Sequence, residues 1–262
     1  MLSSVLCLLL LPLLSYAQQY EGQAIPNSLP TTPGSTITYF KVNDGKGGST
    51  TLINYFSRPN GKKQDSTKVK RAIVVLHGLN RDPATYFSTM WATIGDANKI
   101  NKDVTEGSVA IMAPYFPSGD DKGTGCVSTR SLFAWASLLT PFVRYPWDDS
   151  KPAGQGSTSN ALVWRGSQWA YGENNQYPHY QQTVSSYDVL DQILHYFDNK
   201  ALYPNLNQIV IAGHSLGAQM VHRYAAVGKD LNLATPLVYW VRTSRQRFYK
   251  HTLIRKMEIV DR

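Results

Sequence analysis

Short runs of apolar, β-branched residues alternate along the chain with segments that fit amphipathic helices. Such apolar runs are typical of strands that are buried on both faces of a parallel sheet. The helical segments include one with apolar side chains at helical spacing, between residues 181 and 199. The predicted strands span residues 71–76, 108–113, 208–212 and 236–241, and the predicted helices span 83–98, 181–199 and 218–227.

The first two predicted strands, residues 36–42 and 50–56, are expected to pair as a hairpin. They are separated by Asn43-Asp44-Gly45-Lys46-Gly47-Gly48, which is a strong turn signal. Beyond this hairpin, strands and helices alternate. The pattern therefore predicts an α/β domain over residues 18–241, with a mostly parallel sheet and helices on both faces.

The N-terminal residues predict a secreted protein. An apolar run from Val5 to Leu14 is followed by the small residues Ser15 and Ala17. The run is too short to span a bilayer, so residues 1–17 are expected to form a cleaved signal peptide. An uncleaved anchor is the alternative. No later apolar run approaches 18 residues, so no stable membrane insertion is expected.

The formal net charge of +8 is concentrated in the last residues of the chain. Residues 242–262 carry seven Lys or Arg and two acidic side chains, and the rest of the chain is close to balance. This distribution shows no basic footprint for nucleic acid on the domain, so no nucleic-acid partner is expected. Residues 242–262 form a basic, atypical tail.

The pentapeptide Gly213-His214-Ser215-Leu216-Gly217 has the G-x-S-x-G pattern and lies between a predicted strand and a predicted helix. In that context a serine occupies a sharp, strained turn, where glycines avoid clashes. The following helix directs its N-terminal amides at the site. Ser215 is therefore the predicted nucleophile.

A second signal, His77-Gly78, directly follows the strand at residues 71–76. In this type of fold, the loop after that strand provides one oxyanion-hole amide, and the residue after the nucleophile provides the other. The predicted donors are the backbone amides of Leu79 and Leu216. A structural turn in a non-catalytic protein is the alternative.

The stretches HGLNRDP (residues 77–83) and GHSLGAQM (residues 213–220) resemble the α/β-hydrolase superfamily, and in particular secreted fungal hydrolase-like proteins. The resemblance implies a serine esterase, lipase or related acyl hydrolase that acts on a small-molecule, ester-like substrate. It implies no cofactor. A metal site is not predicted, because the chain has no His-x-x-x-His pair or Cys cluster.

The catalytic acid and base have no clear position in the sequence. In this fold they follow the nucleophile, on loops after further strands. Residues 242–262 are too few for two such strands with their crossovers, so the sheet is expected to be truncated at its C-terminal end. Within the tail, His251 is the candidate base and Asp261 the candidate acid, in the wrong chain order. A non-catalytic binding protein with this fold is the alternative.

Residues 115–178 are rich in Gly, Pro, Ser, Trp and Tyr and show no clear periodicity. We expect an irregular, cap-like insertion there, whose aromatic side chains either line a substrate pocket or pack in the core. These side chains are Trp135, Trp147, Trp164, Trp169, Tyr115, Tyr145, Tyr171 and Tyr177.

Overall fold

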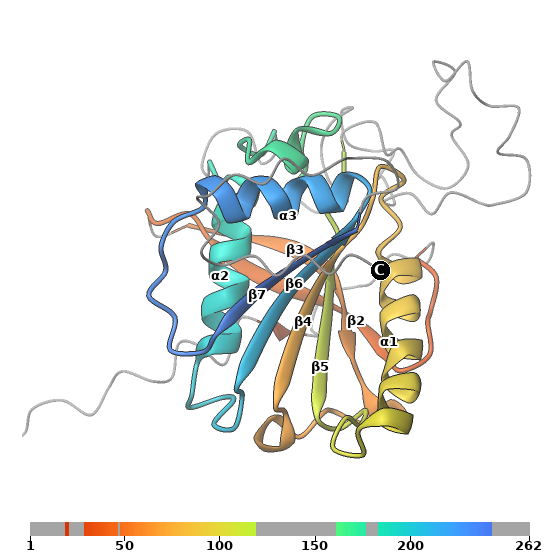
Figure 1. The fold of residues 1–262 in the computed structure, drawn as a ribbon. Helices are drawn as coiled ribbons and strands as arrows, with labels where there is room; N and C mark the ends of the chain where they lie inside the picture. The colour runs from red at the N-terminus through yellow and green to blue at the C-terminus, as the bar shows by residue number, and fades with distance from the viewer. Residues whose placement is uncertain (1–18, 21–28, 47, 119–160, 177–182, 243–262) are drawn as a thin grey trace, which may run out of the picture.

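The computed structural model describes residues 19–20, 29–46, 48–118, 161–176 and 183–242. Their strands form one seven-stranded sheet in the order β1-β2-β3-β5-β4-β6-β7 (Figure 1). The strands are β1 (Gln19–Tyr20), β2 (Ser35–Asn43), β3 (Ser49–Ser57), β4 (Arg71–Leu76), β5 (Val109–Pro114), β6 (Gln208–His214) and β7 (Leu237–Arg242). The helices are α1 (Pro83–Ile100), α2 (Ser186–Asp198) and α3 (Leu216–Val227). The described residues also form three short 3₁₀ helices, η2 (Pro59–Gly61), η3 (Ser66–Lys68) and η5 (Gln168–Tyr171).

The sheet has a parallel half and an antiparallel half. Strand β4 pairs in parallel with β5 on one side and β6 on the other, and β6 pairs in parallel with β7. The hairpin of β2 and β3 is antiparallel and joins the sheet through β3 and β5. The fold class predicted from the sequence, an α/β-hydrolase-like sheet with an N-terminal hairpin, is confirmed.

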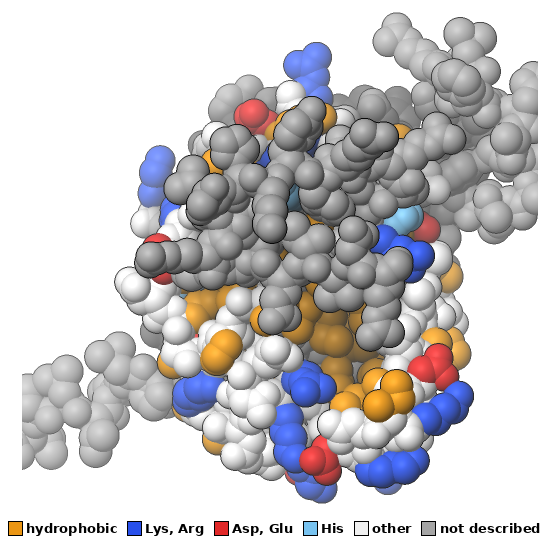
Figure 2. Space-filling view, viewed as in Figure 1, with side chains coloured by type: hydrophobic (Ala, Val, Ile, Leu, Met, Phe, Trp, Pro, Cys, Tyr) orange, Lys and Arg blue, Asp and Glu red, His pale blue; other side chains and the backbone are white. Residues whose placement is uncertain are grey.

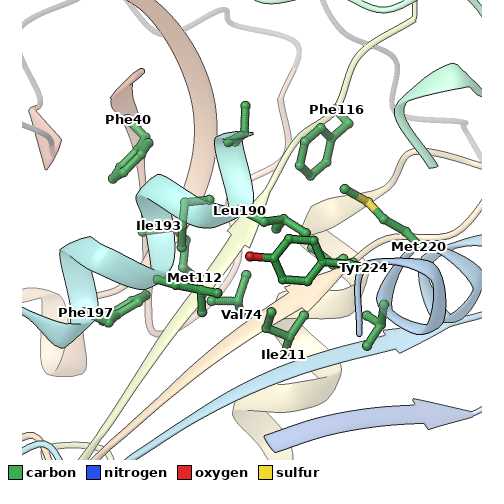
Figure 3. Close-up of a cluster of buried hydrophobic side chains, with 14 of the residues drawn as sticks. Phe40, Val74, Met112, Phe116, Leu190, Ile193, Phe197, Ile211, Met220 and Tyr224 are labelled. Carbon is green, nitrogen blue, oxygen red and sulfur yellow. The ribbon is translucent and has the colours of Figure 1, made fainter. Parts of the chain in front are cut away.

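Helices cover both faces of the parallel strands, and alternate residues of each strand supply the two cores. On one face, Val75 and Ile111 pack with Phe87 of α1. On the opposite face, side chains from β4, β5 and β6 pack against α2 and α3 (Figure 3). Full burial of each large apolar side chain in this layer stabilises the fold by roughly 1.5–3 kcal/mol.

Helix α2 begins at Ser186, so the sequence prediction of a start at residue 181 is wrong. A capping box sets the start: the Ser185 hydroxyl accepts a hydrogen bond from the Asp188 amide at 3.0 Å, and the Asp188 carboxylate accepts one from the Ser185 amide at 3.1 Å. This reciprocal pair satisfies two amides that the first turn leaves without partners. The apolar Val184 that extended the helical pattern lies before the cap and is buried.

The described parts of the region 115–178 belong largely to the core. Trp164 and Trp169 are fully buried, and the ring of each packs against Phe116. Tyr115 is also fully buried, whereas Tyr171 is about half exposed. For these tryptophans the core-packing alternative is therefore correct. Trp135, Trp147, Tyr145 and Tyr177 lie outside the described residues.

The space-filling view looks onto β7, at one edge of the sheet, and shows hydrophobic side chains on that side of the molecule (Figure 2). Trp240 of β7 is 37% exposed, and Leu237 and Val238 are half-buried. Within the described part of the chain, no helix combines the length and the apolar character needed to cross a bilayer. The predicted signal peptide and almost all of the basic tail lie outside the described residues.

Candidate functional site

Ser215 lies at the tip of a sharp turn between β6 and α3 and is exposed. Its backbone has φ 57° and ψ −122°, a conformation that a residue with a side chain rarely adopts. Strain of this kind costs of order 1–3 kcal/mol and persists where the surrounding structure enforces it. The strand–turn–helix context expected for the G-x-S-x-G pattern is therefore present around Ser215.

Glycines enforce this turn through close backbone contacts. A Cβ atom on Gly213 would lie 2.5 Å from the carbonyl of Gly217. A Cβ atom on Gly217 would lie 2.5 Å from the carbonyl oxygen of Leu76 and 2.6 Å from that of His77. Real Cβ atoms do not approach backbone this closely, so α3 can begin against the end of β4 only because both positions lack side chains.

His77 is fully buried at the end of β4 and connects two loops of the site. Its Nε2 accepts a hydrogen bond from the Phe116 amide at 3.0 Å, so the proton resides on Nδ1, which donates to the Gly78 carbonyl at 3.0 Å. Burial, with a smaller contribution from the positive charge of Arg81, lowers the pKa of His77 to about 3. The imidazole is therefore neutral, and it packs edge-on against Trp169 with ring centroids 4.5 Å apart.

The two predicted oxyanion-hole residues belong to the two loops that meet at Ser215. Leu79 follows Gly78 in the turn after β4, and its side chain is 59% exposed. Leu216 is the first residue of α3 and is buried. At this position an amide has no acceptor within its own helix. A Cβ atom on Gly78 would lie 3.5 Å from Ser215 Cβ, so the loop after β4 and the serine are neighbours.

Tyr86 is a residue of this site that the sequence did not single out. It lies in the first turn of α1, and its hydroxyl oxygen is 3.5 Å from His214 Nδ1. The same oxygen would be 2.7 Å from a Cβ atom on Gly78. The only sequence signal for it is its position on the helix that follows the His77-Gly78 loop.

The histidines of the described chain are not arranged around Ser215 as a catalytic base. His77 is buried in the neutral form, and His195 and His222 are exposed on α2 and α3. His214 is exposed, and among the described residues no side chain is hydrogen-bonded to the Ser215 hydroxyl. The candidate base His251 lies outside the described residues.

No group of three or more His, Cys, Asp or Glu side chains in the described ranges is close enough to hold a metal ion. Among the described residues, the turn at Ser215 presents a serine hydroxyl, backbone amides at a helix N-terminus and a neighbouring phenol.

No family model matches the chain, and no curated protein matches it in sequence. Among solved structures it is similar to Thermogutta terrifontis esterase 2 phosphorylated by paraoxon, at 13% identity and a TM-score of 0.36, over 80% of this chain and 58% of that one. It is also similar to a siderophore hydrolase from Aspergillus nidulans, at 15% identity and a TM-score of 0.36, over 84% of this chain and 60% of that one.

A third similar structure is a dienelactone hydrolase-like promiscuous phosphotriesterase from metagenomic libraries. The identity is 13% and the TM-score 0.36, with 80% of this chain and 59% of that one covered. The chain thus spans about three fifths of the length of these three proteins. The assignment of an α/β-hydrolase-like fold stands on the strand order, the two helical layers and the turn at Ser215.

Proposed function

We propose that this protein is a serine hydrolase of carboxylic esters or related acyl compounds, with Ser215 as its nucleophile. One observation carries the proposal: Ser215 is exposed at φ 57° in a strand-to-helix turn that two glycines make possible. A backbone held in an unfavourable conformation at an exposed hydroxyl is a feature of nucleophile elbows.

In the proposed reaction, the Ser215 oxygen attacks the carbonyl carbon of an ester. A C–O bond forms, the carbonyl π electrons move to the oxygen, and the serine proton passes to an imidazole base. The amides of Leu79 and Leu216 hold the resulting oxyanion. Collapse expels the alcohol, which takes up the proton, and water then cleaves the acyl-enzyme to release the acid and restore the serine.

The base in this scheme lies outside the described residues. His251 is the candidate from the sequence, with Asp261 as its acid, and both belong to residues 243–262. His77 is not a candidate for this role, since it is buried and its two ring nitrogens are both engaged. Mutation of His251 to Gln should abolish turnover if it is the base and leave turnover intact if it is not.

Turnover of p-nitrophenyl esters with acyl chains of two to eight carbons tests the proposal. We expect hydrolysis by the wild-type protein and none above background by Ser215→Ala. An exposed hydroxyl contributes little to folding, so both proteins should unfold at the same temperature, which makes Ser215→Ala a clean control. Equal rates for the two proteins would show that the serine is not the nucleophile.

A binding protein with this fold is the second candidate function. The observation that favours it is that none of the described histidine side chains is hydrogen-bonded to the Ser215 hydroxyl. Such a protein would bind esters at the elbow without releasing product. Isothermal titration with a non-hydrolysable ester analogue, in parallel with the turnover assay, separates the two functions.

We further propose that the protein is exported, with cleavage after Ala17. Gln19 and Tyr20 would then be retained, and in the structure they pair with Phe40 and Tyr39 of β2 as strand β1. The N-terminal mass of protein recovered from culture medium should correspond to a chain that starts at Gln18. A chain that still starts at Met1 would contradict export with cleavage.

A further inference from the structure

The Tyr86 hydroxyl lies against Gly78, which precedes one proposed oxyanion-hole amide, and Gly78 in turn lies near Ser215, which precedes the other. Gly78 precedes Leu79, and Ser215 precedes Leu216. A Cβ atom on Gly78 would be 2.7 Å from the Tyr86 oxygen and 3.5 Å from Ser215 Cβ, so the phenol and the serine side chain flank the same small space. Because Gly78 has no side chain, no atom of residue 78 enters that space.

The position of this phenol is set by α1. The helix begins with Pro83 in its first turn, and the next residue after Tyr86, Phe87, is fully buried and stacks on Trp91 at 5.8 Å. The Phe87 anchor fixes the rotation of α1 against the sheet, and this rotation directs Tyr86 toward the end of β6. Tyr86 itself is only partly buried, as expected for a side chain at the edge of a site.

The Tyr86 phenol keeps its proton at neutral pH. Burial, together with the nearby Asp82 charge, raises the pKa of Tyr86 above its ordinary value. The Tyr86 oxygen and His214 Nδ1 are 3.5 Å apart, which is long for a hydrogen bond of a hydroxyl whichever of the two atoms donates. A stronger acceptor in the site, such as an oxyanion, would compete successfully for this proton.

We propose that Tyr86 is a third oxyanion-stabilising residue, whose hydroxyl donates a hydrogen bond to the tetrahedral oxyanion formed at Ser215. The inference rests on the function proposed above. Because the oxyanion exists only after attack by the serine, the bond acts on the reaction barrier and not on substrate binding. Loss of one oxyanion-hole donor typically lowers the rate by about 10²–10³-fold.

The test compares Tyr86→Phe with the wild type in ester hydrolysis. Phenylalanine keeps the ring and removes only the hydroxyl, so the fold should be retained. We expect kcat to fall about 10²-fold with KM nearly unchanged. Inhibition by a phenylboronic acid, which forms a tetrahedral adduct with an active serine, should weaken by a similar factor.

Tyr187→Phe is the matched control, because it removes a buried hydroxyl that has no hydrogen-bond partner among the described residues. It should leave both kcat and boronate inhibition unchanged. If the wild type shows no Ser215-dependent turnover, the proposed function itself is overturned. If the wild type is active and Tyr86→Phe matches it in kcat and in boronate inhibition, only the role of Tyr86 is overturned.

Discussion

The Phe116 amide donates a hydrogen bond to Nε2 of His77 at 3.0 Å, and this bond joins the loop after β4 to the loop after β5. The other ring nitrogen of His77 donates to the Gly78 carbonyl, which also accepts from the Arg81 amide at 3.1 Å. The histidine thus shapes the turn that positions Leu79. These contacts give His77 a structural role in the loop after β4.

Substitution of His77 should reveal this role through the pH dependence of stability. The pKa of His77 is about 3 in the folded protein against an ordinary value of 6.5. As the pH falls below 6.5, the unfolded chain binds a proton that the folded chain excludes, so stability is complete above pH 6.5 and decreases toward pH 3. Between pH 7 and pH 5 this single group should cost about 1–2 kcal/mol.

Urea unfolding of the wild type and His77→Gln at both pH values measures this contribution. The glutamine oxygen can still accept from the Phe116 amide but does not titrate. We expect the free energy of unfolding of the wild type to fall by about 1–2 kcal/mol more than that of the variant between pH 7 and pH 5. The contributions of the other titrating groups are common to both proteins and cancel in the difference. Equal losses would contradict a neutral, buried His77.

Gly217 should tolerate no side chain. In Gly217→Ala the new Cβ would meet the carbonyl oxygens of Leu76 and His77 at 2.5 and 2.6 Å, and both belong to backbone that cannot move without disrupting the sheet. We expect a loss of at least about 3 kcal/mol in the free energy of unfolding, or no folded protein.

Gly95→Ala is the matched control for this prediction. Gly95 is exposed within α1, and a Cβ there would have no atom within 4 Å. The alanine should stabilise the protein by about 0.5–1 kcal/mol because it has the higher helix propensity. Similar effects of the two substitutions in thermal unfolding would mean that the contact between α3 and β4 is not as tight as described.

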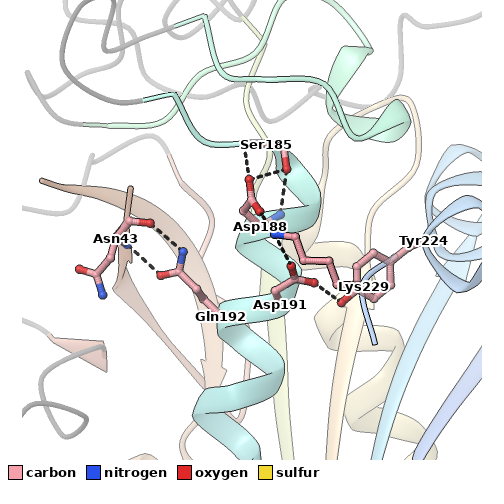
Figure 4. Close-up of polar contacts among 7 residues, drawn as sticks. All are labelled: Asn43, Ser185, Asp188, Asp191, Gln192, Tyr224 and Lys229. Carbon is pink, nitrogen blue, oxygen red and sulfur yellow. Dashed lines mark hydrogen bonds and ion pairs between the residues drawn. The ribbon is translucent and has the colours of Figure 1, made fainter. Parts of the chain in front are cut away.

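A buried carboxylate ties α2 to α3 and to the turn that follows (Figure 4). Asp191 of α2 is 7% exposed and accepts a hydrogen bond from the Tyr224 hydroxyl at 2.6 Å. Lys229 pairs with Asp191 at 3.3 Å and also with Asp188. Burial acts to raise the pKa of Asp188, but the hydrogen bonds from Lys229 and Ser185 outweigh it and lower the pKa.

Tyr224→Phe should destabilise the protein by about 1.5–3 kcal/mol, the range for hydrogen bonds to charged groups. A double-mutant cycle with Asp191→Asn measures the coupling directly, and we expect it to be at least about 1 kcal/mol. Lys229→Met should cost less than about 1 kcal/mol, since the ammonium is mostly exposed. A coupling near zero would show that Tyr224 and Asp191 contribute independently.

Much of the sheet could be predicted from the sequence because its strands are continuous apolar runs. Strand β4 has the predicted bounds, β5 and β7 are each shifted by one residue at both ends, and β6 ends two residues later than predicted. The start of α2 could not be predicted from apolar spacing, because Val184 continues the helical pattern and the Ser185–Asp188 cap interrupts it. The capping hydrogen bonds, and not the spacing of apolar residues, determine where α2 begins.

From the sequence, the candidate site could be predicted only where its residues lie together in one short motif. Gly213, Ser215 and Gly217 form such a segment. Tyr86 could not be found in this way, because its relation to Ser215 depends on how α1 packs against the sheet through Phe87. His77 belongs to a motif that the sequence shows, but its hydrogen bond with Phe116 could not be predicted, because the two residues are 39 apart in the chain.

The measurement that tests the central claim most directly is covalent labelling with a fluorophosphonate probe, read by peptide mass spectrometry. A serine with ordinary reactivity does not react with such probes, whereas an activated one does. We predict a single adduct on Ser215, absent from Ser215→Ala and from wild-type protein unfolded in urea. Folded wild-type protein that remains unlabelled would contradict an activated nucleophile and identify the turn at Ser215 as a structural element of a binding protein.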